Sequence, residues 1–170
     1  MQTQDKEFNI QQSVKLVKDM LKDKSLKKSR DTLKAGDLFF GTYDAKNKEN
    51  VYDKRPFIIL LKQNKTHILG LNFHYLPLKF RSTLIKAILK VNANNIKNKK
   101  RLEFSYEDFK PFLRKFGYSP CIRLYIRNRM SSTVIKIKSE DLMQSSKLNT
   151  AVFTNGISSE TLYKKAIQNK

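Results

Sequence analysis

The sequence reads PFIILLKQNKTHILGLNF over residues 56–73. Residues 56–62 form a continuous apolar run of strand length, and Pro56 suits its first position, where no backbone donor is needed. Residues 66–73 form a second apolar run, and the polar connection of three residues predicts that the two strands pair antiparallel. A third strand is expected at 36–44, opened by Gly36. These strands predict a small curled sheet or barrel.

Helical periodicity flanks this strand block. Apolar residues recur at spacings of three and four over 10–33, 80–91, 106–116 and 120–130. Asn9 and Gln12 are expected to cap the first helix, and Ser158 or Ser159 to cap a last helix ending near residue 167. Two further strands, 133–138 and 151–153, and a short helix after residue 139 complete the prediction.

The predicted fold class is therefore α+β, a small antiparallel β-barrel with a basic helical insertion and flanking helices. Residues 1–34 are interpreted as a basic N-terminal helix or arm, and residues 35–170 as a single domain. Within that domain we expect a strand block at 35–78, the insertion at 79–130, and closing strands and a helix at 131–170.

Charge is concentrated in one part of the chain. The sequence of 170 residues carries 35 Lys and Arg against 15 Asp and Glu, a formal net charge of +20. Residues 79–138 alone account for +13 of this excess. An excess of basic residues indicates a polyanionic partner, nucleic acid before an anionic membrane. The alternative, a lysine-biased genome, predicts a more even distribution.

Several protein classes are disfavoured. No run approaches the roughly 18–20 apolar residues of a membrane-spanning helix. The polar first twelve residues do not resemble a secretory signal, and Cys121, the single cysteine, cannot form an internal disulfide. We therefore expect an intracellular or particle-borne protein, with no membrane partner.

Chemistry-bearing motifs are sparse. His67, His74 and Cys121 lack metal-ligand spacing, and neither a Walker loop nor a dinucleotide fingerprint is present. We expect no metal, no cofactor and no catalytic residue. A metal nuclease remains a minor alternative, because acidic residues lie near predicted strand ends.

Basic side chains in the insertion are the candidate DNA contacts. Arg pairs with phosphate through a planar fork and Lys through a point charge. No sequence-reading module is recognisable, so we expect backbone binding without base specificity. The candidates are Arg81, Lys86, Lys97, Lys99, Lys100, Arg101, Arg123, Arg127 and Arg129.

Three elements carry a family resemblance. They are GDLFFGTYDAK at 36–46, YDKRP at 52–56, and GLNFHYLP at 70–77 followed by Arg81. In this order they resemble the DNA end protector proteins of T-even-type tailed phages, and the similarity covers about residues 36–165. The residues that match the family motif are Tyr43, Asp44, Lys46, Tyr52, Asp53, Pro56, Asn72, His74, Tyr75 and Pro77.

The resemblance implies a non-enzymatic virion protein. Such a protein would bind the ends of packaged linear double-stranded DNA and travel with them into the host cytoplasm. There it would block host exonucleases. It would also have a role in completing the head before tail joining, and head or neck proteins would then be partners. The oligomeric state is left open.

Two alternatives stay open. Gly36-Asp37 and Arg55-Pro56 also resemble the SH3-like barrel of endoribonuclease toxins, which is the origin of our SH3-like assignment for the strand block. The toxins carry a hydroxyl residue after the third strand, where this chain has Phe73-His74-Tyr75. The other alternative is a head–tail structural protein whose basic face contacts DNA.

Overall fold

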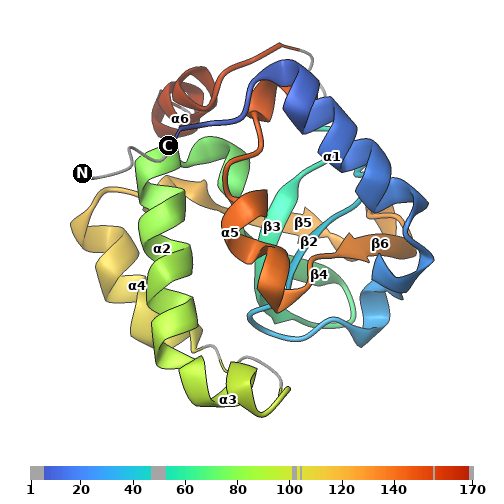
Figure 1. Ribbon diagram of the computed structural model, residues 1–170. Coiled ribbons are helices and arrows are strands. Elements are labelled where there is room, and N and C mark those ends of the chain that lie inside the picture. Colours follow the sequence, from blue (N-terminus) through green and yellow to red (C-terminus); the bar gives the residue numbers. More distant parts are fainter. Residues whose placement is uncertain (1–5, 47–52, 101–102, 104, 155, 169–170) are drawn as a thin grey trace.

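The computed structural model describes residues 6–46, 53–100, 103, 105–154 and 156–168. In these residues a layer of helices covers an antiparallel sheet (Figure 1). The strands are β1 (Lys27–Ser29), β2 (Leu38–Phe40), β3 (Phe57–Gln63), β4 (His67–Asn72), β5 (Ile122–Ile126) and β6 (Thr133–Lys136). The helices are α1 (Ile10–Lys22), α2 (Leu78–Val91), α3 (Ala93–Lys97), α4 (Tyr106–Lys115), α5 (Leu142–Ser145) and α6 (Ser159–Gln168).

The apolar run at 57–61 is continuous because both faces of the sheet are buried. Phe57, Ile59 and Leu61 face the main core beneath the helices, whereas Ile58 and Leu60 face a smaller cluster on the opposite side. Successive strand residues point to opposite faces, so only an apolar residue at every position satisfies both cores. The same alternation divides β2, whose middle residue alone faces the smaller cluster.

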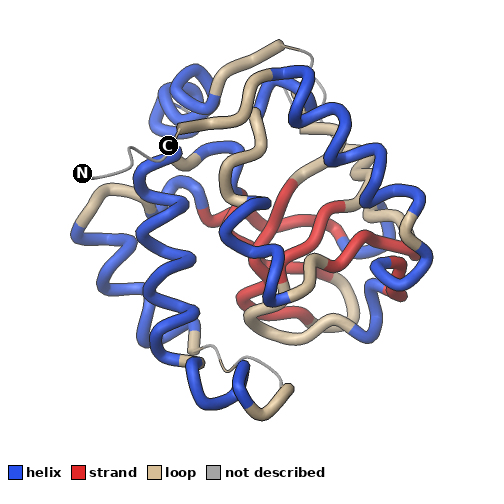
Figure 2. Tube along the Cα trace, in the orientation of Figure 1, coloured by secondary structure: helices blue, strands red, loops and turns tan. Residues whose placement is uncertain are grey.

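The strand order is β1-β6-β2-β3-β4-β5, and every neighbouring pair is antiparallel. The predicted antiparallel pairing of β3 with β4 is confirmed. The predicted closure of the sheet into a barrel is not found, because within the described residues the edge strands β1 and β5 do not pair with each other. Figure 2 shows the strands gathered in one part of the molecule with helices around them.

Side chains and short 3-10 turns connect the two edges instead. Arg30, directly after β1, donates to the carbonyls of Arg127 and Met130, which follow β5. Arg127 in turn donates to Asp31 Oδ1 at 2.6 Å. Residues 30–31 and 127–130 are too irregular to form a strand ladder, so the curled sheet stays open.

The helix predicted over 120–130 is wrong, because this segment contains a strand between two short 3-10 turns. A 3-10 turn at Ser119–Cys121 leads into β5, which pairs with β4 over its whole length. Ile122, Tyr125 and Ile126 fit one helical face, but pairing with β4 outweighs this local pattern. The strand expected at 151–153 is also wrong, since a 3-10 turn occupies Thr150–Val152.

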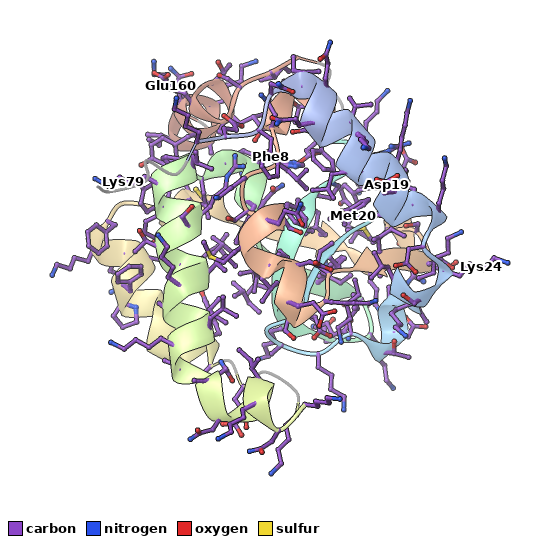
Figure 3. All side chains as sticks on the ribbon, viewed as in Figure 1. Phe8, Asp19, Met20, Lys24, Lys79 and Glu160 are labelled. Carbon is purple, nitrogen blue, oxygen red and sulfur yellow. The ribbon has the colours of Figure 1, made fainter. Side chains whose placement is uncertain are left out.

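Residues 6–34 pack onto the same core as the rest of the chain. Val17 and Met20 of α1 are buried, and Figure 3 shows Met20 pointing inward and Lys24 outward. The predicted cap is confirmed, because Asn9 Oδ1 accepts from the Gln12 amide at 2.8 Å and Gln12 Oε1 from the Asn9 amide at 3.1 Å. The helix ends at Lys22, and the remainder of the predicted helix contains β1.

Helices α2 and α4 lie side by side (Figure 1). Their contact is aromatic, with the rings of Phe80 and Phe112 stacked at 5.5 Å between centroids. Phe80, Leu84, Ile85 and Ile88 form the buried side of α2, as its periodicity predicts. The polar side of this helical insertion is therefore left for solvent.

Gly70 of β4 lies against the smaller cluster, where no space is left for a side chain. A Cβ at this position would lie 2.2 Å from Ile58 Cγ2, and Ile58 is fully buried. We expect Gly70→Ala to lower the free energy of unfolding by about 1–3 kcal/mol, measured by urea denaturation. Ile58→Ala removes the clashing methyl group, so the double variant should cost less than the sum of the two single variants. Additive losses would contradict this packing.

Candidate nucleic-acid interface

The lysines of the insertion lie on its exposed side. Lys86 projects from α2, and Lys97, Lys99 and Lys100 lie at the end of α3 and just after it, all exposed. Three further basic residues, Lys110, Arg114 and Lys115, are exposed on α4. The sequence prediction missed these three, although their spacing on the polar side of a helix could have identified them. The helical layer thus presents a basic surface formed by α2, α3 and α4.

The three candidate arginines near β5 have different surroundings. Arg123 is exposed on β5, with its guanidinium 5.4 Å from the centre of the Tyr75 ring. Arg127 pairs with Asp31, and Arg129 lies 3.5 Å from Asp44 Oδ2. Nearby carboxylates therefore offset the charge of two of the three. Arg101 lies outside the described residues.

Arg81 is buried in the protein interior, with 1% of its surface exposed. Its Nε donates to the Leu76 carbonyl and Nη1 to the Leu148 carbonyl, both at 2.9 Å. Its Nη2 donates to Thr150 Oγ1 at 2.6 Å and also to Ser159 Oγ. Burial lowers the pKa of Arg81 to about 10, although the negative charge of Glu7 acts in the opposite direction and raises this pKa. The side chain is thus charged at neutral pH but is directed away from any surface that DNA could reach.

Arg81→Met is expected to lower the free energy of unfolding by about 3 kcal/mol, because two buried carbonyls would lose their donors. The loss would appear as a lower denaturation midpoint in urea. Lys79→Met, an exposed change on the same helix (Figure 3), should leave the midpoint within about 0.5 kcal/mol of the original. Equal effects of the two variants would contradict an interior role for Arg81.

The family-motif residues converge on a buried polar network. Asp53 Oδ2 accepts from Asn72 Nδ2 at 3.2 Å and lies in hydrogen-bond contact with His74 Nδ1. Asn72 Nδ2 also donates to the Tyr125 hydroxyl at 3.0 Å, and Asn72 Oδ1 accepts from the His74 amide at 2.9 Å. Burial raises the pKa of Tyr125 well above its ordinary value, so this hydroxyl stays neutral. The network joins the loop before β3, the end of β4 and the middle of β5.

The other motif residues surround this network. Tyr43 packs edge-on against Tyr125 at 5.0 Å, and its hydroxyl accepts from the Ile126 amide at 3.2 Å. Pro56 and Tyr75 are buried, while Asp44, Lys46 and Pro77 are exposed. Tyr52 lies outside the described residues. Most of the motif therefore joins strands together and does not form a surface patch.

The site offers little for catalysis. His74 Nε2 is buried without a hydrogen-bond partner among the described residues, so substrate could not reach it. Burial raises the pKa of Cys121 to about 12, which keeps this thiol protonated and unreactive at neutral pH. Within the described chain no three His, Cys, Asp or Glu side chains are grouped to hold a metal ion. Among the helices that the structure describes, none is long and apolar enough to cross a membrane.

Asp53→Ala should destabilise the fold by about 2–4 kcal/mol, since the Asn72 amide, the His74 ring and the Arg55 backbone N–H would lose an acceptor. Chemical denaturation measures this loss. Lys54→Ala is the matched control, because it truncates the exposed neighbour. An Asp53→Ala protein as stable as the control would show that the network contributes nothing to folding.

Comparison with known families gives one clear result. A family model described as Phage T4 terminal DNA protecting protein matches residues 2–166. Comparison with curated proteins and with solved structures gives no match. The family match spans both the buried motif network and the basic helical layer.

Proposed function

Since the chain belongs to the family of Phage T4 terminal DNA protecting proteins, we propose that it binds the ends of linear double-stranded DNA and shields them from exonucleases. The family match over residues 2–166 is the observation that carries this proposal. Binding is to the phosphate backbone and is independent of base sequence. The protein acts by covering the end and not by catalysis.

The distribution of charge supports backbone binding. Exposed lysines on α2 and α3, together with the basic residues of α4, project from an insertion whose other side is buried in the core. Lysine attracts phosphate as a point charge without demanding one geometry. A layer of such side chains suits a ligand with a regular charge and a variable sequence.

The place of action follows from the same family membership. We propose that the protein is carried in the phage head with the packaged DNA and enters the host cytoplasm with it. Completion of the head before tail joining, through contacts with head or neck proteins, is part of this proposal. A head–tail structural protein that contacts DNA without preferring ends is the second candidate, favoured by the same basic surface.

An SH3-like arrangement of strands β2 to β6 remains a proposal. The order β6-β2-β3-β4-β5, with the 3-10 turn Arg127–Arg129 between β5 and β6, supports it. The endoribonuclease alternative has less support, because His74, which lies after the third strand, is buried. Arg55 is exposed, and its backbone N–H donates to Asp53 Oδ1. In the toxins that the chain resembles, the Arg before the Pro takes part in catalysis, so Arg55→Ala would abolish RNA cleavage if that alternative held.

The preference for ends is tested with one DNA sequence in two forms. We expect the protein to bind a blunt linear duplex more tightly than a covalently closed circle of the same length, measured by fluorescence anisotropy. Bound protein should also slow digestion of the linear form by a processive exonuclease. Equal affinity for both forms would overturn end binding and favour the structural candidate.

The contribution of the helical layer is tested through salt dependence. In the triple variant Lys86→Gln, Lys97→Gln and Lys99→Gln, the log–log salt slope should become less negative by about 2–3, roughly 0.9 for each phosphate that a lysine no longer neutralises. The matched control replaces Lys62, Lys65 and Lys164, which are exposed lysines outside the insertion, and should leave the slope unchanged. Equal changes in the two triple variants would place the DNA-binding side chains outside the helical layer.

A further inference from the structure

A groove of about 350 Å³ lies between the β1 region, β6 and the segment that follows α3. Its charged lining comes from parts of the chain far apart in sequence. The lining lysines are Lys28, Lys100, Lys136 and Lys138, and the lining carboxylates are Asp37 and Glu140. We call this the lysine groove.

One of the two carboxylates is already balanced. Asp37 Oδ1 lies 3.3 Å from Lys136 Nζ, and Asp37 Oδ2 accepts from the Lys34 amide at 2.9 Å. Lys28, Lys100 and Lys138 are exposed at the groove, whose second lining carboxylate is Glu140, and the carboxylate of Asp23 interacts electrostatically with Lys138. The lysine groove therefore carries a positive excess inside a confined volume, where charges attract more strongly than on an open surface.

The backbone after α3 brings Lys100 to this position. Lys99 has a positive φ of 53°, and the Lys100 amide donates to the Asn95 carbonyl at 2.7 Å. The Lys99 amide donates to the Ile96 carbonyl at 3.1 Å, which completes a Schellman C-cap. Residues other than glycine are uncommon in this conformation. Only Lys100 of the two lines the groove.

Resting on the proposed function, we propose that the lysine groove binds the terminal phosphate monoester of a DNA strand. A phosphate monoester carries a charge of about −1.5 to −2 at pH 7, against −1 for each internal diester. A pocket of this volume is at the small end of ligand sites and admits a strand terminus but not a duplex. The groove therefore distinguishes a DNA end from the interior of the molecule by charge and by size.

The test uses DNA hairpins with one blunt end that differ only at that end. The probes carry a 5′-phosphate, a 3′-phosphate or hydroxyls alone. We expect one phosphorylated form to bind about tenfold more tightly than the hydroxyl form, a magnitude typical of charge-assisted hydrogen bonds. The preferred form identifies which strand end enters the groove.

Two variants locate the effect. Lys100→Gln combined with Lys138→Gln should reduce the phosphate preference to less than about twofold. Lys99→Gly removes a neighbouring charge and keeps the backbone turn, so it should retain the full preference even if overall affinity falls. Circular dichroism confirms that each variant is folded.

The outcomes separate this inference from the proposed function. If linear DNA binds better than circular DNA but all three hairpins bind equally, the inference is overturned and end binding stands. A preference that survives in the Lys100 and Lys138 double variant would also overturn the assignment to this groove. If linear and circular DNA bind equally, the proposed function itself fails.

Discussion

The buried guanidinium of Arg81 is the interaction on which the arrangement of layers depends. It holds the start of α2 through the Leu76 carbonyl, and the C-terminal segment through Leu148, Thr150 and Ser159. A buried cation without full hydrogen bonding is very costly, so these partners must stay together. Helix α2, which carries part of the basic helical layer, is thereby connected to the segment 148–159 near the C-terminus.

A second group of buried polar side chains connects strands within the sheet. Asp53, Asn72, His74 and Tyr125 connect the approach to β3, the end of β4 and the edge strand β5. A buried network of this kind favours one register, because a shift by one residue would leave further buried groups unpaired in addition to His74 Nε2. Strand β5 follows helices α2 to α4 and, like β1, has one neighbouring strand in the described sheet, so the network adds contacts that hold it in register.

The sequence predicts the parts of this fold whose patterns are local. The apolar run of β3, the periodicity of α2 and the Asn9–Gln12 cap depend on neighbouring residues, and each is confirmed. The helix predicted over residues 122–126 is wrong because their apolar spacing suits a helix as well as a strand, and only β4 decides between them. The surface position predicted for Arg81 is wrong for a similar reason, since its partners at 148–159 are remote in sequence.

Arginine and lysine have different surroundings in this structure, and this explains why the exposed basic side chains differ from the predicted set. Arg30, Arg81 and Arg127 donate to backbone carbonyls, where a planar group with fixed donors satisfies several acceptors at once. Lysines stay exposed on the helical layer, at the lysine groove and elsewhere on the surface, since their strongly hydrated charge resists burial. Several arginines of this chain therefore connect parts of the fold, and the exposed charge of the helical layer belongs mainly to lysine. A sequence-based choice that ranks arginine first for phosphate contact overlooks this competition, because the residue best suited to phosphate is also best suited to carbonyl oxygens in the interior.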